Sequence, residues 1–176
     1  MIAKIKEGNN NLKNEEVEKL IQFPGLNIHH IDKETKKTVL SVSNKFEYEH
    51  EHHTAKKLTS HNYHILFTPK GYFKRSEKKH DIFLIKQHLI LEADLKCIFS
   101  KNPDTIDNRI KEGSEQASRI VLDIHSDIEK MTLIDGLRLG CQRNDFLKQI
   151  LLFYRSRFFI LQKDQILGKN IFNILK

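Results

Sequence analysis

Two short stretches near the N-terminus alternate between hydrophobic and polar residues, which is the pattern of a strand with one buried face. They cover residues 26–31 and 38–42, and the polar connection between them predicts a β-hairpin. Upstream, Asn14 precedes several glutamates and can cap a short helix, because its side-chain oxygen can accept a hydrogen bond from an unpaired backbone N–H. That helix is predicted to end before the turn sequence Phe23-Pro24-Gly25.

The hydrophobic stretches beyond residue 45 predict helices and strands in mixed order. Short runs of β-branched and aromatic residues indicate strands, whereas hydrophobic residues three or four apart indicate helices. The predicted order is helix, three strands, helix and strand, which places the chain in the α/β class. The elements are a helix at residues 46–60, strands at 63–68, 81–85 and 89–99, a helix from Asp104 or Thr105 to about residue 118, and a strand at 119–124.

The last third of the chain adds further elements to this pattern. Residues 119–124 (RIVLDI) are nearly all hydrophobic, which is typical of a strand buried on both faces. A helix is predicted over residues 126–139. Residues 148–154 and 157–161 then predict a hairpin across Arg155-Ser156, and a short hydrophobic helix closes the chain.

Length and charge define the general kind of protein. The 176 residues fit one domain with a small attachment, and we place the division at residue 45. Residues 1–45 would then form an N-terminal accessory segment, and residues 46–176 the main domain. The formal net charge is +7, which suits a polyanionic partner such as nucleic acid.

The sequence argues against a membrane-spanning protein and against a precursor with a Sec signal. No hydrophobic run approaches the roughly 20 residues that span a bilayer. The N-terminus also lacks the hydrophobic core of a secretory signal. Cys97 and Cys141 lie far apart and form no CxxC motif, so both are predicted to be reduced thiols.

Three charged residues interrupt neighbouring predicted strands. Asp81 opens one strand, and Asp94 and Lys96 lie in the next, where residues two apart share a face. A hairpin between the strands would bring Asp81 beside Asp94. Because buried charges are costly unless paired or bound to a metal, two carboxylates here suit Mg²⁺ or Mn²⁺. A nearby lysine can orient a water or stabilise phosphoryl charge, so the pattern predicts metal-dependent phosphodiester hydrolysis.

The same spacing also fits a solvent-exposed strand face held by salt bridges. On that interpretation Glu92, Asp94 and Lys96 point outward while the residues between them pack inward. Cys97 follows the lysine directly, so it is predicted to point to the opposite face and to belong to the core. The spacing alone does not separate the two interpretations.

Other residues offer weaker candidates for binding. His50, His52 and His53 could supply zinc ligands, but neighbours in a helix point in different directions, which favours a solvated helix surface. Arg109 and Lys111 could add phosphate contacts. A basic loop with interleaved aromatic residues precedes Asp81, and such loops suit contact with RNA or single strands. Its predicted substrate-binding residues are Lys70, Lys74, Arg75, Lys78 and Lys79.

A longer stretch, from Glu51 to Ile124, resembles the PD-(D/E)xK nuclease superfamily, whose fold is restriction-endonuclease-like. More closely, it resembles the C-terminal tRNA nuclease domains of bacterial contact-dependent growth-inhibition toxins and related polymorphic toxins. The quoted matches are Glu51, Ala55, Leu58 and Tyr63-His64-Ile65, then His80-Asp81, then Glu92-Ala93-Asp94-Leu95-Lys96, and finally residues 113–124 with Gln116.

The resemblance implies a mixed sheet flanked by helices in the order α-β-β-β-α-β, with an added N-terminal segment and a C-terminal hairpin. It implies metal binding by Asp81, Asp94 and Glu51, with catalysis assisted by Lys96 and Gln116. Two departures stand out. Histidine replaces the usual proline before Asp81, and two acids, Glu92 and Asp94, share one face. Glu47 and Glu49 also compete with Glu51 as the helical carboxylate.

These implications define the expected function. The chain is expected to be a metal-dependent, toxin-like ribonuclease acting on tRNA, using Mg²⁺ or Mn²⁺, with Zn²⁺ as a further option. The alternatives are a DNA endonuclease of the same fold from a mobile element and a non-catalytic relative that binds nucleic acid or a partner. The resemblance also implies an acidic immunity protein as partner and action in the bacterial cytoplasm, with delivery from another cell as one route.

Overall fold

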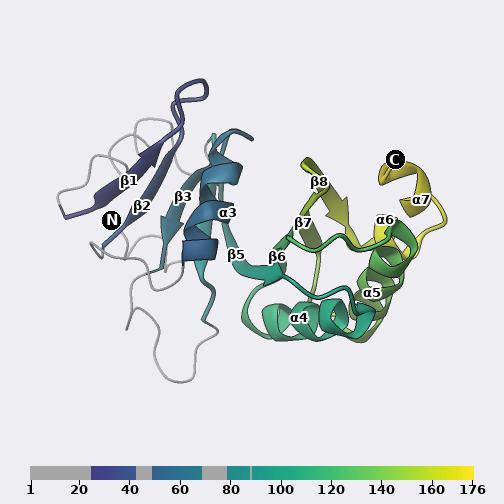
Figure 1. Cartoon of the computed structure of the whole chain (residues 1–176). Coiled ribbons are helices and arrows are strands. Elements are labelled where there is room, and N and C mark those ends of the chain that lie inside the picture. The colour runs from purple at the N-terminus through teal and green to yellow at the C-terminus, as the bar shows by residue number, and fades with distance from the viewer. Residues whose placement is uncertain (1–24, 43–48, 69–78, 88) are drawn as a thin grey trace. The chain divides into compact units, whose positions relative to one another are not determined.

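The computed structural model describes residues 25–42, 49–68, 79–87 and 89–176 (Figure 1). The chain divides into two compact units. Unit 1 comprises residues 1–77 and 81–92, and unit 2 comprises residues 78–80 and 93–176. Each unit combines helix with parallel and antiparallel strand pairs, so the predicted mixed α/β class is confirmed.

The described residues of unit 1 include four paired strands and one helix. The predicted hairpin is confirmed, since β1 pairs with β2 in antiparallel orientation. β2 then pairs in parallel with β3, and β3 pairs antiparallel with β4. The N-terminal hairpin therefore shares its sheet with strands that follow the helix. The elements are β1 (Asn27–Ile31), β2 (Thr38–Ser41), α3 (Glu49–Thr59), β3 (His64–Phe67) and β4 (Ile82–Lys86).

The core of unit 1 contains a buried histidine beside hydrophobic residues. Leu40, Leu66 and Phe83 pack together on neighbouring strands. The Nδ1 atom of His64 lies 3.0 Å from the Thr38 hydroxyl oxygen, and Nε2 lies 3.2 Å from the Lys37 ammonium. Burial, with repulsion from Lys37, lowers the pKa of His64 to about 4. The native structure therefore requires a neutral imidazole at this position.

This histidine predicts acid sensitivity of unit 1. The pKa of His64 is about 4 in the folded chain, against 6.5 for an exposed histidine. Between these values the unfolded chain binds a proton that the folded chain does not, so stability falls as the pH drops from about 6.5 to about 4. His64→Gln should flatten this dependence when urea unfolding is compared at pH 7 and pH 5. An unchanged slope in His64→Gln, or an equal flattening in a variant of the exposed His53 (His53→Gln), would contradict the assignment.

In unit 2, β6 lies between two parallel partner strands. β6 pairs in parallel with both β5 and β7, and β7 pairs antiparallel with β8. Five of the six residues of β6 are buried, which confirms the strand buried on both faces that its hydrophobic run predicts. The elements are β5 (Leu89–Ile98), which begins in unit 1, α4 (Pro103–Gln116), β6 (Arg119–Ile124), α5 (Lys130–Arg143), β7 (Gln149–Tyr154), β8 (Arg157–Gln162), α6 (Lys163–Leu167) and α7 (Ile171–Ile174).

Two predicted helix boundaries are wrong. Asn102, not Asp104 or Thr105, caps α4: its side-chain oxygen accepts from the Asp104 backbone N–H at 2.9 Å. Pro103 occupies the first turn, where its missing N–H leaves no hydrogen bond unmade. The helix ends at Gln116 because Ala117 is already extended. The next helix, α5, begins at Lys130 rather than residue 126.

The β7–β8 hairpin is confirmed with the predicted two-residue turn. Arg155 and Ser156 have φ values of 49° and 60°, so both residues are left-handed. Two such residues form the turn whose twist matches that of antiparallel strands. The hairpin aligns Phe153 with Phe158, whose ring centroids lie 4.8 Å apart.

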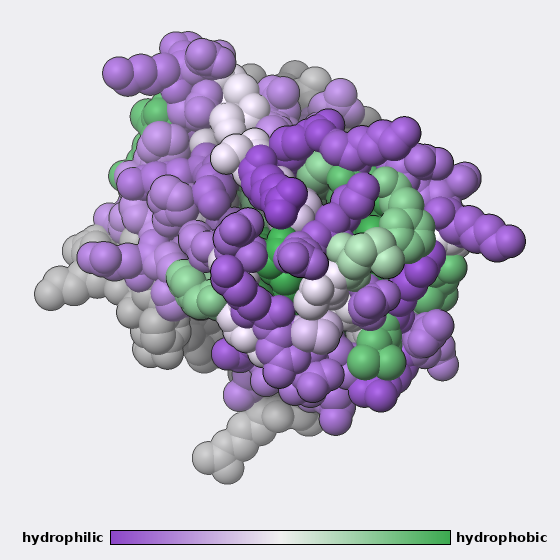
Figure 2. Space-filling view, turned by 45° about the vertical axis from the view of Figure 1, so that its right-hand side comes forward, coloured by the Kyte–Doolittle hydropathy of each residue, from purple (hydrophilic) through white to green (hydrophobic). Residues whose placement is uncertain are grey.

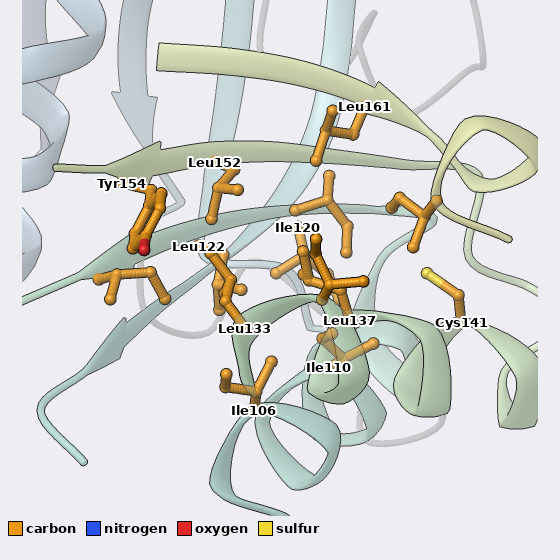
Figure 3. Close-up of a cluster of buried hydrophobic side chains, with 14 of the residues drawn as sticks. Ile106, Ile110, Ile120, Leu122, Leu133, Leu137, Cys141, Leu152, Tyr154 and Leu161 are labelled. Atoms are coloured by element: carbon orange, nitrogen blue, oxygen red, sulfur yellow. The ribbon is translucent and has the colours of Figure 1, made fainter. Parts of the chain in front are cut away.

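A hydrophobic core lies between the strands of unit 2 and its helices (Figure 3). Ile120 and Leu122 of β6 meet Leu133 and Leu137 of α5. All four side chains are fully buried. The Tyr154 hydroxyl, at the margin of this core, donates to the Ile128 carbonyl oxygen at 2.9 Å. This hydrophobic core therefore fixes the positions of α4 and α5 on the strands of unit 2.

Glycines on α5 let α4 approach closely. A Cβ atom added at Gly136 would lie 2.8 Å from the Ile106 Cβ and 2.9 Å from the Pro103 carbonyl oxygen. Gly136→Ala is therefore expected to lower the free energy of unfolding by about 1–2 kcal/mol, because overpacking costs more than the better helix propensity of alanine returns. Chemical denaturation checks this. Asp135→Ala, at the exposed neighbouring position, is the control and should change stability by less than about 0.5 kcal/mol.

Hydrophilic residues cover most of the face of the described chain that is shown in Figure 2. In the face shown in Figure 2, hydrophobic residues form separate small groups among hydrophilic ones. Within the described ranges, none of the helices has the length and hydrophobicity that crossing a bilayer requires. Several predicted features lie outside the described residues. They are the helix at Asn14, the start of the helix at 46–48 with Glu47, and four basic-loop residues, Lys70, Lys74, Arg75 and Lys78.

Candidate functional site

Asp94 and Lys96 lie on the face of β5 that α4 covers. In the parallel register Asp94 is opposite Ile120 and Lys96 is opposite Leu122. Both β6 residues belong to the hydrophobic core of unit 2. Because paired residues in neighbouring strands point to the same side, the two charged side chains of β5 also face this core. They do not form part of a solvent-exposed strand face.

These two charges are paired with each other at the margin of the core. The Lys96 ammonium lies 2.5 Å from Asp94 Oδ2. The side chain of Asp94 is fully buried, and that of Lys96 is 14% exposed. Glu92, two residues earlier, is exposed. One interpretation of the sequence placed Glu92, Asp94 and Lys96 on a solvent-exposed face. The burial of Asp94 excludes that interpretation for Asp94.

Gly113 of α4 makes room for the Asp94 carboxylate. A Cβ atom added at residue 113 would lie 2.9 Å from Asp94 Oδ2 and 3.0 Å from two Ile120 side-chain atoms. The helix can therefore approach the carboxylate only because residue 113 has no side chain. This close approach places the last turn of α4 directly against the Asp94–Lys96 pair.

Gln116 ends the same turn of α4. It follows Gly113 by three residues, and residues three apart lie on one side of a helix. Its side chain is half-buried. Gln116 is therefore the last residue of the helical turn that begins at Gly113, beside Asp94.

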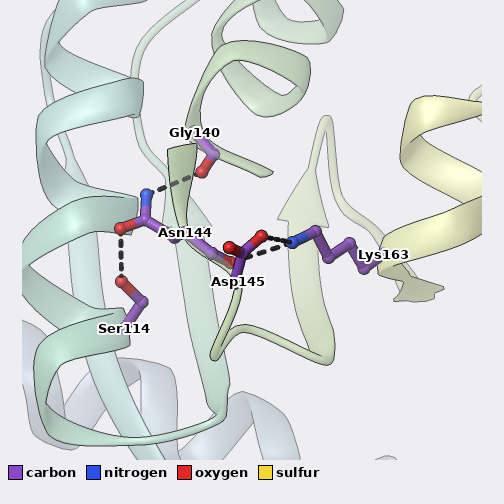
Figure 4. Close-up of polar contacts among 5 residues, drawn as sticks. All are labelled: Ser114, Gly140, Asn144, Asp145 and Lys163. Atoms are coloured by element: carbon purple, nitrogen blue, oxygen red, sulfur yellow. Dashed lines mark hydrogen bonds and ion pairs between the residues drawn. The ribbon is translucent and has the colours of Figure 1, made fainter. Parts of the chain in front are cut away.

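A polar network fixes this end of α4 to α5 (Figure 4). The Ser114 hydroxyl lies 2.9 Å from Asn144 Oδ1, and Asn144 Nδ2 donates to the Gly140 carbonyl oxygen at 2.7 Å. The Lys163 ammonium donates to the Asn144 backbone oxygen at 3.0 Å and pairs with Asp145 at 3.4 Å. Nearby, Arg143 pairs with Asp107 at 2.5 Å. These contacts hold the last turn of α4, and with it Gly113, in place.

The other predicted ligands lie in unit 1. Asp81 immediately precedes β4, and its carbonyl oxygen accepts from the Thr68 backbone N–H at 2.9 Å. Its side chain is partly buried. Glu51 lies in the first turn of α3 and is also partly buried, whereas Glu49 is exposed. The joint placement of Asp81, Glu51 and Asp94 remains a prediction of the sequence.

Basic residues of the described chain are largely at the surface. Lys79, the predicted substrate contact that is described, is exposed. Arg109 and Lys111 are exposed on α4, and Arg109 pairs with Glu112 at 2.7 Å. A surface pair of this kind contributes little to stability and leaves the guanidinium accessible.

The histidines of α3 differ in how far their side chains are exposed to solvent. His53 is exposed, whereas His50 and His52 are partly buried. The ring of His52 meets that of His29 at 6.0 Å in an edge-to-face arrangement. Burial, together with nearby cationic groups, lowers the pKa of His52 to about 4. The three histidines were a weak zinc candidate in the sequence, and among the described residues they do not form a metal-ligand group.

A different group of ligand atoms was missed in the sequence. Cys97, Asp123 and His125 each offer one ligand atom, and these atoms all lie within 4.8 Å of one another. The sequence predicted that Cys97 belongs to the core, but its thiol is only half-buried. It lies beside the side chains of Asp123 and His125. The signal was Asp123 in an otherwise hydrophobic strand, followed by His125 on the same face. Its link to Cys97 required the β5–β6 register.

Comparison with known proteins gave no match to a family model, a curated protein or a solved structure.

Proposed function

We propose that the chain is a metal-dependent nuclease whose catalytic groups include Asp94 and Lys96. The observation that carries the proposal is the ion pair of a fully buried aspartate with a lysine two residues later on the same strand. A buried pair of this kind is at best weakly stabilising, because removing both charges from water is costly. Its presence in a hydrophobic layer therefore favours a chemical role.

The two side chains suit complementary tasks in phosphodiester hydrolysis. Asp94 pairs with Lys96 through its Oδ2 atom. Its other carboxylate oxygen, Oδ1, would be the ligand to a hard cation such as Mg²⁺ or Mn²⁺. Lys96, at the partly exposed end of the pair, can contact a scissile phosphate and stabilise charge that develops on it. Gln116, with its amide at the adjacent end of α4, can orient a water by hydrogen bonding. When bound, the metal ion would supply a Lewis acid and a water of lowered pKa.

A single carboxylate is a poor site for Mg²⁺, so the proposal includes further ligands. Asp81 and Glu51 are the candidates from the sequence, and both are partly buried in the structure. Asp94 is preferred over Glu92 because it is buried and paired with Lys96, whereas Glu92 is exposed. The restriction-endonuclease-like arrangement belongs to the same proposal. It is supported by the order of α3, β3, β4, β5, α4 and β6 along the chain.

The proposed substrate is RNA, and tRNA in particular. Support comes from the net charge of +7, from exposed cations such as Lys79 and Lys111, and from the resemblance of the motif order to toxin tRNA nucleases. A tRNA substrate would place the activity in the bacterial cytoplasm. A basic toxin of this kind is expected to bind an acidic immunity protein, since complementary charge accelerates association.

A cleavage assay tests the proposal directly. Purified chain is incubated with total tRNA and, separately, with plasmid DNA, each with Mg²⁺, Mn²⁺, Zn²⁺ or EDTA. We expect tRNA fragments of defined length with Mg²⁺ or Mn²⁺ and intact tRNA with EDTA. Cleavage of plasmid alone would favour a DNA endonuclease. Binding of tRNA without cleavage under any metal condition would favour a non-catalytic relative and overturn the proposal.

A further inference from the structure

We propose that Cys97, Asp123 and His125 form a Zn²⁺ site that is separate from Asp94 and Lys96. The register aligns Cys97 of β5 with Asp123 of β6, and His125 follows β6 directly. Cys97 lies next to Lys96, so its side chain is on the other face of β5. The proposed zinc site and the proposed nuclease residues thus lie on opposite faces of the same strand.

The ligand types suit zinc better than magnesium. A thiolate, an imidazole and a carboxylate are the nitrogen, sulfur and oxygen donors that Zn²⁺ prefers, whereas Mg²⁺ prefers oxygen alone. The thiolate and carboxylate together carry two negative charges, which balance a divalent cation. Three protein ligands leave a fourth tetrahedral position for water, as in zinc sites that are open to solvent.

The distances are compatible with a small adjustment on binding. Ligand atoms around tetrahedral zinc lie about 3.3–3.6 Å apart, given bond lengths of about 2.0–2.3 Å. Here His125 Nε2 lies 3.1 Å from Asp123 Oδ2, and all three ligand atoms lie within 4.8 Å of one another. Side-chain rotation of the half-buried Cys97 can supply the remaining shift.

Burial and stacking hold two of the ligands in position. Asp123 is fully buried in β6, where a carboxylate needs a cation or a strong hydrogen-bond donor nearby. The His125 ring stacks on Phe99 with centroids 4.8 Å apart, and its backbone N–H donates to the Ile98 carbonyl oxygen at 2.8 Å. The imidazole is therefore oriented toward Asp123, while its side chain is still 23% exposed and accessible to an ion.

Cobalt binding tests the site without any need for nuclease activity. The chain is stripped with EDTA, kept reduced with a non-thiol reductant and titrated with Co²⁺, because thiolate ligation to Co²⁺ produces a near-ultraviolet charge-transfer band. We expect the band to saturate at one thiolate-bound Co²⁺ per chain and to disappear when Zn²⁺ displaces it. Cys97→Ser should abolish the band. His125→Gln should weaken Co²⁺ binding by at least about 100-fold, because loss of a residue that only contacts a metal ligand already costs about 10–100-fold.

Matched variants separate this site from the rest of the chain. Cys141→Ala should keep the band, because Cys141 is fully buried and burial raises the pKa of its thiol to about 12. Asp94→Asn should also keep it, which distinguishes failure here from failure of the proposed nuclease site. The proposal is overturned if wild-type chain shows no thiolate band or if Cys97→Ser keeps it. Unchanged Co²⁺ affinity in a folded His125→Gln variant would also overturn it, because His125 would then not be a ligand.

Discussion

Asp94→Asn is expected to reduce metal-dependent RNA cleavage by on the order of 10²–10³-fold or more, the cost of removing one key electrostatic group from an active site. The amide matches the carboxylate in size, so it fits beside Gly113 without a new clash. It lacks the negative charge that would hold a divalent ion and pair with Lys96. Cleavage rates under saturating Mg²⁺ or Mn²⁺, with circular dichroism to confirm the fold, measure the effect.

Glu92→Gln is the matched control for this variant. Glu92 lies on the same strand and the same face as Asp94, but it is exposed. Its amide variant should cleave RNA at the wild-type rate. If Glu92→Gln lost cleavage while Asp94→Asn retained it, Glu92 would be the principal acid and the assignment of Asp94 would be wrong.

Lys96→Met should destabilise the chain by about 3 kcal/mol or more, because breaking a buried ion pair leaves the other charge poorly compensated. The methionine preserves most of the length and volume of the lysine stem. Asp94→Asn combined with Lys96→Met should lose less stability than the two single variants together, by about 1–3 kcal/mol. Urea unfolding of the four proteins completes the cycle.

A second cycle on exposed groups provides the comparison. Arg109 and Glu112 form an ion pair on α4 in which both side chains are about half exposed. Removing either or both should show a coupling of no more than about 0.5 kcal/mol. Equal coupling energies in the two cycles would show that Asp94 and Lys96 interact no more strongly than surface charges. That result would contradict a buried ion pair between them.

Local pattern was enough to predict most of the elements. Alternation predicted the β1–β2 hairpin, and two hydrophobic stretches on either side of Arg155-Ser156 predicted the β7–β8 hairpin. A continuous hydrophobic run predicted that β6 is buried on both faces. These signals are local, since they depend on which side chains point inward along one segment. Helix ends were less predictable: Asn102 and Asp104 are both good caps by type, and the position of Pro103 favours Asn102.

The candidate site was predictable only in part. Spacing two residues apart placed Asp94 and Lys96 on one face, but the same spacing also fitted a solvated strand. Whether that face meets solvent or α4 depends on how the helix packs, and Gly113 permits the close approach. The parallel pairing of β2 with β3 was likewise not predicted, because pairing between distant segments leaves no periodic signal in either.

The sequence by itself determined the mixed α/β class, most strands, the positive charge and the local pairing of an acid with a lysine, because each of these follows from composition or from neighbours along one segment. Only the tertiary structure decided that Asp94 is buried against α4 while Glu92 is exposed. It alone also brought Cys97 within reach of Asp123 and His125. Cys97 lies in β5, whereas Asp123 lies in β6 and His125 directly follows it, so their proximity is set by the strand register rather than by distance along the chain.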